Sequence, residues 1–427
     1  MYTDICSVIK ESGLNIQVIG GRYGVGQKEF TPTFCLAVIK NLQSQTPKNH
    51  FTVGINDDIT HLSLDINEKF SIDYPDRIEC KFYGLGSDGT VGANKNSVKI
   101  IGEETGLFTQ AYFFYDSRKS GGITVSHLRL SKTPIKSPYL IEEPSFVACH
   151  SPSYLERLDM LSGIKKKGVF LLNCPYFGEE LEKRLPNKVK REIAEKELDF
   201  YTIDATKIAE DVGLKGRTST VMQTAFFYLN PFIMPFEKAK SCLERELKAK
   251  FLKKGESVAQ MNLQAVEKTP NNIRKIIYPS EWKNAEITPE TTVKTDYYER
   301  FIKPINTLRG DSLPVSAFNP DGSVHTNTTK LEKHGVAQSI PKWISENCIE
   351  CNQCSFVCPH ATIRSFLIDE NEKTPESFIT KPALGIPNAR FRIQVSPYDC
   401  MGCGVCANEC PAKEKARVMT PVDKLLD

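Results

Sequence analysis

Eight cysteines near the C-terminus stand in two runs of the same spacing. Each run reads C-x2-C-x2-C-x3-C-P: the first holds Cys348, Cys351, Cys354, Cys358 and Pro359, the second Cys400, Cys403, Cys406, Cys410 and Pro411. Thiolates are soft metal ligands, and this spacing is typical of bacterial modules that bind two [4Fe–4S] clusters. The pattern therefore predicts two such clusters, which carry electrons one at a time.

Each cluster needs four thiolates, and one run on a tight loop can present three of them. In two-cluster modules the last cysteine of each run binds the other cluster. We therefore assign Cys348, Cys351, Cys354 and Cys410 to one cluster, and Cys400, Cys403, Cys406 and Cys358 to the other. Zinc and disulfides are the alternatives. Zinc needs only four ligands and no C-x3-C-P ending, while disulfides suit short secreted chains.

The segment between the two runs is longer than a minimal cluster module requires. Residues 369–390 are polar and contain Pro375, Pro382 and Pro387. A docking or covering loop and a plain surface loop both fit this composition. Within the second run, Gly402 and Gly404 leave room beside the ligands, and their amides can donate hydrogen bonds to sulfur.

Composition limits the class of protein. The chain has 427 residues, 25% charged and 40% apolar, which indicates a globular protein of about two to four domains. Its net charge of +3 gives no argument for nucleic acid. No apolar run approaches the ~18 residues of a membrane helix. The N-terminal residues have neither the basic nor the apolar stretch of a secretory signal.

Six further cysteines lie outside the two runs: Cys6, Cys35, Cys80, Cys149, Cys174 and Cys242. They are scattered, and most of them stand in apolar stretches. We expect them to be reduced thiols in the core, as in a reducing compartment. A catalytic thiol at Cys149 or Cys174 is the alternative.

Residues 76–275 alternate between short apolar segments and helical ones. The predicted strands are Ile78–Tyr83, Gln110–Tyr115, Ile123–Leu130, Phe146–His150, Val169–Asn173 and Phe200–Asp204. This alternation is typical of an α/β domain with a mainly parallel sheet. Helices are expected at Gly92–Glu104, at Ser153–Leu161 and between Val221 and Val266. In the last of these, Ala239, Leu243, Leu247 and Phe251 form an apolar stripe.

The flanking segments differ from this pattern. Near the N-terminus we expect a strand at Leu14–Ile19 and a helix to Leu42, capped by Thr31 with Pro32 as its first residue. Residues 276–345 are rich in proline and weak in helical periodicity, which indicates an extended linker or small subdomain. Within it, Leu313–Phe318 resembles a short strand. Residues 346–427 should form an α+β module with a short helix after each cysteine run.

A glycine-rich loop follows the first predicted strand of the α/β domain. Gly84, Gly86 and Gly89 form G-x-G-x-x-G between a strand and a helix, and Lys95 adds a charge. Such a loop lets the backbone approach a phosphate at a helix N-terminus. Asp116, after the next strand, has the position of the acid in a dinucleotide site. Nucleotide binding and a tight structural turn both remain open. So do anion binding and a plain turn for residues 116–122, Asp-Ser-Arg-Lys-Ser-Gly-Gly.

Long strings over nearly the whole chain resemble pyruvate:ferredoxin oxidoreductases, the thiamine-diphosphate iron–sulfur enzymes of anaerobes. The strings are PKNHFTVGINDD (47–58), GLGSDGTVGANK (84–95), YDSRKSGGITVSHLR (115–129), YTIDATKIA (201–209), MQTAFF (222–227), LPVSAF (313–318), NCIECNQCSFVCPHA (347–361) and DCMGCGVCANECP (399–411). The resemblance implies that pyruvate and coenzyme A give acetyl-CoA, carbon dioxide and two electrons. The electrons pass singly through the clusters to ferredoxin or flavodoxin.

The resemblance also implies the domain organisation. Residues 1–45 would end a transketolase-C-terminal-like domain, and 46–275 would be the γ-type α/β domain associated with coenzyme A. Residues 276–345 would be a linker subdomain, and 346–427 a bacterial-type 2[4Fe–4S] ferredoxin domain. The loop would then hold phosphates of coenzyme A rather than NAD, through the matching positions Gly84, Gly86, Gly89, Asn94 and Lys95.

Other parts of the resembling enzymes are not found in these 427 residues. Thiamine diphosphate, Mg²⁺ and a third cluster belong to domains that the sequence does not match, and no catalytic residue is assigned. Gly310-Asp311 is followed by Ser312, where a thiamine-diphosphate signature has glycine. We therefore expect a fragment or one piece of a split enzyme that does not decarboxylate pyruvate alone.

The resemblance implies a homodimeric full enzyme, in the cytoplasm or in an anaerobic organelle such as a hydrogenosome. No membrane or nucleic-acid partner is expected. Two alternatives remain open for the function. One is a non-catalytic iron–sulfur electron-transfer subunit, and the other is a segment of an NADP-linked pyruvate oxidoreductase.

Overall fold

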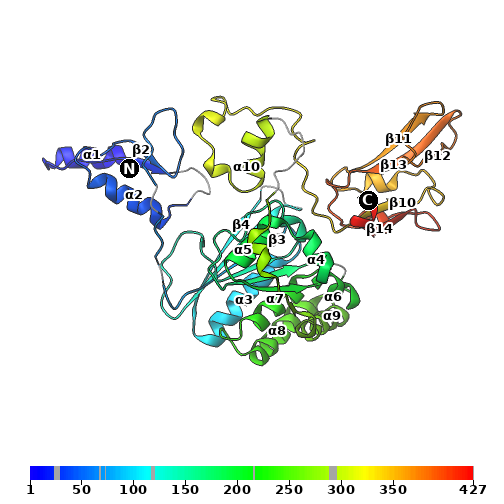
Figure 1. Cartoon of the computed structure of the whole chain (residues 1–427), viewed down its shortest axis with the longest axis horizontal. Helices are drawn as coiled ribbons and strands as arrows, with labels where there is room; N and C mark the ends of the chain where they lie inside the picture. Colours follow the sequence, from blue (N-terminus) through cyan, green and yellow to red (C-terminus); the bar gives the residue numbers. More distant parts are fainter. Residues whose placement is uncertain are drawn as a thin grey trace. The chain divides into compact units, whose positions relative to one another are not determined.

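The computed structural model of the protein describes residues 1–23, 29–66, 69–72, 74–116, 121–214, 217–287 and 296–426. The chain forms two compact units, Met1–Asn327 and Thr328–Asp427 (Figure 1). The first unit contains a large sheet with its helices. The second contains both cysteine runs.

A seven-stranded sheet with the order β4-β5-β3-β6-β7-β8-β9 is the centre of the first unit. Its strands are β3 (Ile78–Leu85), β4 (Phe108–Tyr115), β5 (Ile123–Ser131), β6 (Phe146–Cys149), β7 (Val169–Asn173), β8 (Asp199–Ile203) and β9 (Arg274–Lys275). Strands β3, β6, β7 and β8 are parallel, whereas β4, β5 and β9 pair antiparallel. The predicted α/β domain is confirmed, with a parallel centre and antiparallel edges. The connection from β4 to β5 is too short for the crossover that parallel strands need.

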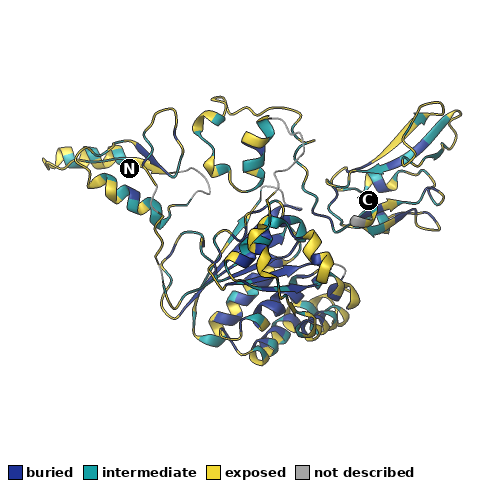
Figure 2. Cartoon of the chain, viewed as in Figure 1, coloured by how far each residue is buried: buried dark blue, intermediate teal, exposed yellow. Residues whose placement is uncertain are grey.

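Helices cover the sheet. They are α3 (Thr90–Thr105), α4 (Gly178–Arg184), α5 (Asn187–Glu195), α6 (Ala205–Asp211), α7 (Ser219–Leu229), α8 (Phe236–Phe251) and α9 (Glu256–Lys268). Helices α3, α7 and α8 contact one another along the sheet (Figure 1). The predicted stripe on α8 is confirmed at Ala239, Leu243 and Leu247, which are buried. Figure 2 shows the buried residues concentrated in the sheet and on the helix faces against it.

Three phenylalanines occupy the middle of this core. The ring centroids of Phe82, Phe146 and Phe226 lie 5.2 to 5.6 Å apart, which joins β3, β6 and α7. Aromatic rings at such separations add to the free energy of ordinary apolar burial. These ring contacts therefore fix the position of β3, which leads into the glycine-rich loop.

The N-terminal segment forms a smaller layer of α1 (Tyr2–Glu11), β1 (Gly21–Tyr23), α2 (Pro32–Leu42) and β2 (Phe51–Val53). Helix α2 begins as predicted, with the Thr31 side chain accepting from the Phe34 amide at 3.4 Å. The strand predicted at Leu14–Ile19 is wrong. Gly21–Tyr23 pairs with β2 instead, and Asn49 Oδ1 holds the Gly20 amide at 2.7 Å just before it.

Two more predicted elements do not form. Ser153–Leu161 contains one 3-10 turn, Pro152–Tyr154, because Tyr154 turns into the core and its hydroxyl donates to the Gly84 carbonyl at 3.1 Å. Leu313–Phe318 is also a 3-10 turn, at Val315–Ala317. The Val315 amide donates to the Asn56 carbonyl at 2.9 Å rather than to a neighbouring strand. The proline-rich segment before it includes the short helix α10 (Lys303–Asn306).

The second unit contains two small sheets. Strand β10 (Ser339–Trp343) pairs antiparallel with β14 (Arg417–Pro421), and β13 (Ala389–Val395) lies between β11 (Ile363–Asp369) and β12 (Lys381–Pro382). The chain ends with α13 (Asp423–Leu426). Strand β10 precedes residue 346, where the sequence places the start of the cluster module, yet it pairs with β14 along its whole length.

The short helices of this unit lie within the cysteine runs, not after them. They are α11 (Gln353–Phe356) and α12 (Val405–Asn408), and each contains the third cysteine of its run. Both start after a residue in the left-handed region, Asn352 at φ 58° and Gly404 at φ 74°. Because of this left-handed residue, each helix starts within its cysteine run. The same turn occurs in both runs, so the two halves of the unit have the same local structure. Among the described residues, no helix is both long and apolar enough to cross a membrane.

The aromatic core gives a prediction for stability. Phe226 is 1% exposed, and Phe226→Ala should lower the free energy of unfolding of the sheet unit by about 3–5 kcal/mol through lost burial and a cavity. Phe232→Ala is the control, because Phe232 is 67% exposed. Denaturant unfolding under anaerobic conditions would measure both. Equal midpoints for the two variants would contradict the role of the aromatic cluster.

Candidate functional site

Two small cavities in the second unit are each lined by four cysteines. Cys348, Cys351, Cys354 and Cys410 line the one that we name the first cavity, and Cys358, Cys400, Cys403 and Cys406 line the second cavity. Each set takes three cysteines from one run and the last cysteine from the other. Helices α11 and α12 are in contact, which brings the two runs together. This is the grouping that crossed ligation requires.

The cavities also share their surroundings. Cys351 and Cys403, the second cysteines of their runs, are exposed, while the first and third of each run are buried. Apolar side chains fill the space between, among them Ile363, Phe391 and Ile393. Such walls keep water from a bound group and raise the strength of every electrostatic interaction with it.

Hydrogen-bond donors approach two of the sulfurs. The amides of Gly402 and Thr362 donate to Cys400 Sγ and Cys358 Sγ, each at 3.4 Å. Burial raises the pKa of Cys358, but the Thr362 hydroxyl and the amides of His360, Thr362 and Ile363 outweigh it and leave this pKa below its usual range. Four thiols with sulfur-directed amides and apolar walls fit an iron–sulfur cluster. Within the described chain, no three His, Cys, Asp or Glu side chains group around a single-ion site.

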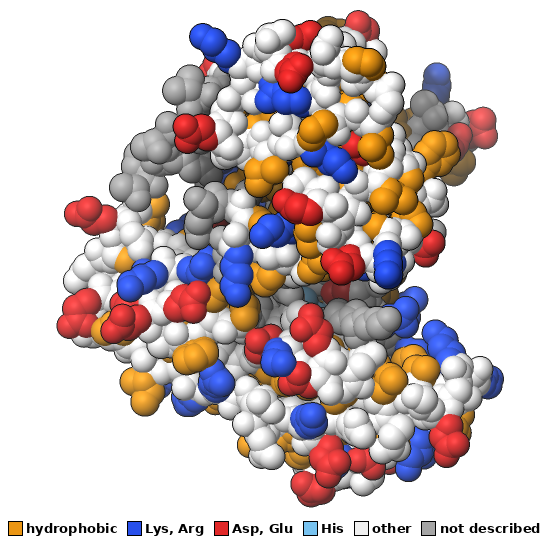
Figure 3. Space-filling view, turned by 90° about the vertical axis from the view of Figure 1, so that its right-hand side faces the viewer, with side chains coloured by type: hydrophobic (Ala, Val, Ile, Leu, Met, Phe, Trp, Pro, Cys, Tyr) orange, Lys and Arg blue, Asp and Glu red, His pale blue; other side chains and the backbone are white. Residues whose placement is uncertain are grey.

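The segment between the runs is fastened over the first run. Lys381 Nζ donates to the Cys348 carbonyl at 2.6 Å, and the Leu384 amide donates to the Glu350 carboxylate at 2.9 Å. These contacts favour a covering segment over a free surface loop. A cavity of about 410 Å³ lies beside it, and its apolar lining includes Ile349, Phe366, Leu367, Leu384 and Ile386. Figure 3 shows hydrophobic side chains interleaved with both charge signs on the face that it presents.

The glycine-rich loop lies at the carboxyl end of β3 and leads into α3, as predicted. At two positions of the loop, the local structure itself requires glycine. A Cβ at Gly84 would lie 2.7 Å from the Thr90 side chain, and Gly89 has φ +92° as the residue before α3. Asn94 is buried within α3 while Lys95 is exposed, so the structure does not bring these two together on the surface.

The loop carries a carboxylate of its own, which sequence reasoning missed. Asp88 accepts hydrogen bonds from the amides of Leu85 at 2.9 Å and Thr90 at 2.7 Å, and from the Thr90 hydroxyl at 2.6 Å. Because the hydroxyl proton goes to Asp88, His150 Nδ1 is the donor to Thr90 Oγ1, 2.8 Å away. Burial lowers the pKa of His150 despite the nearby Asp88, so the imidazole is neutral. Asp88 thus occupies amides that a deeply bound phosphate would need.

An anion can still meet donors at the outer rim of the loop. Asp88 already accepts from the Thr90 amide, but the next two amides of the first helical turn, those of Val91 and Gly92, have no intrahelical partner. A Cβ at Gly92 would lie 3.9 Å from Lys250 Nζ, and one at Gly89 would lie 2.7 Å from the Ser219 hydroxyl oxygen. Lys250 and Ser219 come from α8 and α7, far along the sequence. No local motif could have pointed to them.

The second anion candidate ends beside this loop. The Gly86 amide donates to the Gly122 carbonyl at 2.7 Å, and the Asp116 amide donates to the Ile123 carbonyl at 2.9 Å. Residues 117–120, which hold the predicted cations and hydroxyls, lie outside the described residues. The described ends therefore place the start and finish of this segment near the glycine-rich loop.

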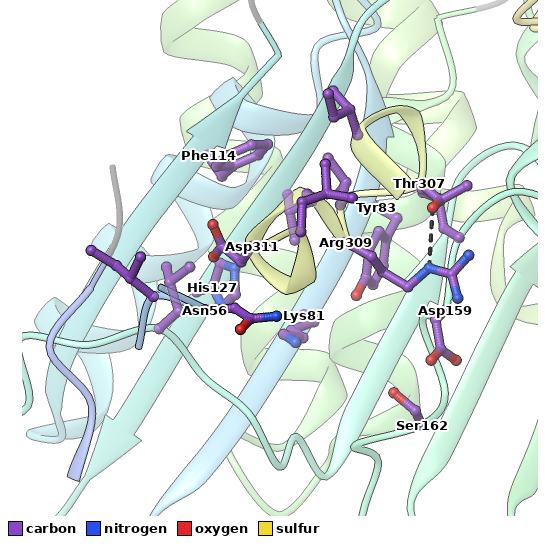
Figure 4. A pocket seen from close by; sticks show the side chains of 18 of the residues that line it. Asn56, Lys81, Tyr83, Phe114, His127, Asp159, Ser162, Thr307, Arg309 and Asp311 are labelled. Carbon is purple, nitrogen blue, oxygen red and sulfur yellow. Dashed lines mark hydrogen bonds between the residues drawn. The ribbon is translucent and has the colours of Figure 1, made fainter. Parts of the chain in front are cut away.

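A larger cavity of about 890 Å³ lies on the other face of the sheet, opposite the aromatic core (Figure 4). Residues alternate in direction along a strand, so Phe82 faces the core while Lys81 and Tyr83 face this cavity. Lys81 is the cross-strand partner of His127, and both line the wall. Residues 305–318 supply the opposite wall, where Arg309 Nε donates to the Thr307 hydroxyl at 3.1 Å. The volume is that of a small-molecule pocket.

Lys81 is the unusual residue of this cavity. Among the described residues its ammonium has neither a hydrogen bond nor an ion pair, and burial lowers its pKa to about 8. His127 Nδ1 accepts from the Ile141 amide at 3.2 Å, and burial beside Lys81 and Arg129 lowers its pKa to about 2. A lysine amid the apolar residues of a central strand is the signal that sequence reasoning could have used.

The remaining cysteines follow the core prediction only in part. Cys80, Cys149, Cys174 and Cys242 are buried, and burial raises the pKa of Cys149 and of Cys174 to about 12. These thiols are therefore protonated, which disfavours the catalytic alternative. The prediction is wrong for Cys35, which is exposed, and for Cys6, which is half-buried, since α1 buries none of its residues and α2 buries only Ala37.

Three segments of the chain match known families. Residues 79–270 match the family described as pyruvate ferredoxin/flavodoxin oxidoreductase, 284–337 a domain of unknown function and 347–413 the 4Fe-4S dicluster domain. Together with the two cysteine cavities, these matches indicate a chain that combines a segment of the pyruvate ferredoxin/flavodoxin oxidoreductase family with a 4Fe-4S dicluster segment.

Curated relatives extend the match to the whole chain. The chain is 50% identical to pyruvate:ferredoxin oxidoreductase of Moorella thermoacetica, over 100% of this chain and 37% of that protein. It is 43% identical to pyruvate-flavodoxin oxidoreductase of Enterobacter agglomerans, over 99% of this chain and 36% of that protein. With pyruvate dehydrogenase (NADP+), mitochondrial, of Euglena gracilis it shares 40% identity over 96% of this chain and 23% of that protein.

The chain is thus homologous along its length to part of the pyruvate:ferredoxin/flavodoxin oxidoreductases, and the resemblance seen in the sequence is confirmed. It spans a little over a third of the length of the first two relatives.

The environment of Lys81 gives a prediction for its reactivity. Neutral amines react with acetic anhydride, so labelling of Lys81 should rise through a midpoint near pH 8, the pKa to which burial lowers it. Lys99 is the control, because its hydrogen bond to Glu246 raises its pKa and should delay labelling to higher pH. Pulse labelling over a pH series with peptide mass spectrometry would follow both. Rates that rise together would contradict the unpaired, half-buried ammonium.

Proposed function

We propose that this chain is the electron-relay and coenzyme A-docking portion of a pyruvate:ferredoxin oxidoreductase. In that reaction pyruvate, coenzyme A and two oxidised one-electron acceptors give acetyl-CoA, carbon dioxide, a proton and two reduced acceptors. The observation that carries the proposal is the gathering of eight cysteines into two cavities of four. The domains that hold thiamine diphosphate, Mg²⁺ and a third cluster would belong to the rest of the enzyme, and the full enzyme would be a homodimer.

The residues around the cavities would prepare the chain for electron transfer. A [4Fe–4S] cluster, when bound, supplies reversible one-electron chemistry. Cys348, Cys351, Cys354 and Cys410 would hold one, and Cys358, Cys400, Cys403 and Cys406 the other. The amides of Gly402 and Thr362 would stabilise the negative charge that reduction adds at sulfur. Ferredoxin or flavodoxin would take the electrons, in the cytoplasm or in an anaerobic organelle.

The rim of the glycine-rich loop would hold phosphates of coenzyme A. Gly86 and Gly89 would give the backbone room, and Lys95 and Lys250 would supply charge near the first turn of α3. Asp88 would order the loop and keep phosphate at the rim rather than deep within it. We retain Gly84 and Asn94 as supporting residues, since both lie in the packed part of this region.

An NADP-linked enzyme is the second candidate. The Euglena gracilis relative is named for NADP+, and it matches this chain over 96% of the chain's length. The two candidates differ in the final electron acceptor. Reduction of ferredoxin or flavodoxin, compared with reduction of NADP+, by the complete enzyme would separate them.

Cluster content tests the relay. Anaerobically reconstituted chain should contain about eight irons and eight sulfides. Cys410→Ala should empty the first cavity, so Cys348, Cys351 and Cys354 become reactive to iodoacetamide while Cys400, Cys403 and Cys406 stay protected. Cys35→Ala is the control, because Cys35 is exposed in the first unit and should leave the metal content unchanged. Zinc in place of iron would refute the relay, and exposure of the Cys400 set would refute the crossed pairing.

Coenzyme A binding tests the docking role. Lys95→Met and Lys250→Met should each weaken binding to the chain about threefold to tenfold, the effect of losing one polar contact to a phosphate. Isothermal titration calorimetry would measure the affinity. Lys99→Met is the matched control on the same helix, since Glu246 already binds Lys99 at 3.0 Å. Unchanged affinity in both test variants, or equal loss in the control, would contradict the proposed rim.

A further inference from the structure

The β10–β14 ribbon lays one cross-strand pair over each cysteine cavity. Trp343 pairs with Arg417, and both line the first cavity. Pro341 pairs with Met419, and both line the second cavity. The two halves of this unit repeat each other in spacing and helix position, but these covering pairs differ in charge. One cavity receives a guanidinium and an indole, and the other receives two apolar side chains.

Arg417 is buried without an anion. It is 2% exposed, and its Nη1 donates to the Pro341 carbonyl at 3.4 Å. Its Nε and Nη2 have no hydrogen-bond partner within the described chain, and neither has Trp343 Nε1. A guanidinium stays charged at any relevant pH, and burying it unpaired is costly. The four cysteines that share its cavity are the groups able to present negative charge there.

Further cations surround the same set of cysteines. Lys381 Nζ lies 2.6 Å from the Cys348 carbonyl oxygen, and Lys415 Nζ lies 2.6 Å from that of Cys410. Glu350 and Glu409 each stand next to a cysteine of this set, and Glu350 lies 3.7 Å from Lys381 Nζ. The residues that line the second cavity include His360 but no lysine or arginine. Two of its sulfurs receive the neutral amides of Gly402 and Thr362, and the charge of Arg417, which does not line this cavity, also acts on Cys406.

We propose that Arg417, assisted by Trp343, makes the cluster of the first cavity the electron acceptor of the pair. The proposal rests on the proposed cluster binding. Reduction adds one negative charge and no obligatory proton, and a buried fixed cation stabilises that charge more than neutral dipoles do. The potential in the first cavity is then the higher of the two. An electron shared between the two clusters would then reside mainly on the one that Cys348, Cys351, Cys354 and Cys410 would hold, and the other cluster would be left oxidised.

Redox titration of the full chain followed by EPR tests this assignment. The unmodified chain must first contain about eight irons and eight sulfides; a shortfall there refutes the cluster proposal itself, not the role of Arg417. Arg417→Met should then lower the higher of the two potentials, shifting the electron distribution between the clusters at least tenfold, about 59 mV for one electron. Trp343→Phe, which removes the N–H together with the five-membered ring of the indole and leaves Arg417 in place, should shift it in the same direction by less.

Three controls accompany the titration. Arg417→Lys retains the charge and should restore most of the potential lost in Arg417→Met. Lys413→Met removes an exposed cation near the same strand and should move neither potential. Cys351→Ser changes one ligand of the first cavity only, and its altered EPR signal identifies which potential belongs to that set.

Two results overturn the proposal. One is a fall in the lower potential in place of the higher one, and the other is an equal shift of both. If Arg417→Met does not retain its clusters, Trp343→Phe and Arg417→Lys decide the question. If the higher potential is unchanged in Trp343→Phe and is lowered in Arg417→Lys, the buried charge is not its cause.

Discussion

The second unit depends on one geometric demand, that four thiols from two separate runs meet at each cavity. No run can complete a set alone, because its last cysteine lies at the other cavity. Clusters bound as proposed would therefore hold the two runs together, in addition to the contact of α11 with α12. Metal binding and folding are coupled in such sites, so clusters bound as proposed would make this unit and its cofactors a single cooperative structure.

The first unit is organised by a different constraint, the fixing of one strand end. Phe82 anchors β3 in the aromatic core, and Tyr154 binds the Gly84 carbonyl just above it. Asp88, Thr90 and His150 then order the turn into α3 through short hydrogen bonds. A ligand at the rim meets a surface that is already rigid, which reduces the entropy lost on binding.

Residue spacing in the sequence predicted those features of the structure that depend on residues close together in the chain. The cap of α2 and six strands of the central sheet follow from short-range patterns, and the structure contains them, whereas β9 was not predicted. The structure also places the cysteines in two groups of four. Tertiary contacts decided the rest. Tyr154 is drawn into the core and ends the helix expected at Ser153–Leu161, while Lys250 reaches α3 from a distant helix. The hydrogen-bond donors of Arg417 and Trp343 that lack an acceptor could not be predicted either, because they follow from the pairing of β10 with β14.

Strand β10 lies in what the sequence marks as linker, yet it forms half of the ribbon above both cavities. A cluster domain excised from residue 346 onward would therefore lose Trp343 and expose the backbone of β14 as an unpaired edge. Open edges recruit other strands, and such a product would tend to associate with itself. A boundary placed before Ser339 would keep β10 paired with β14. The end of the predicted linker therefore belongs structurally to the domain that contains the two cysteine cavities.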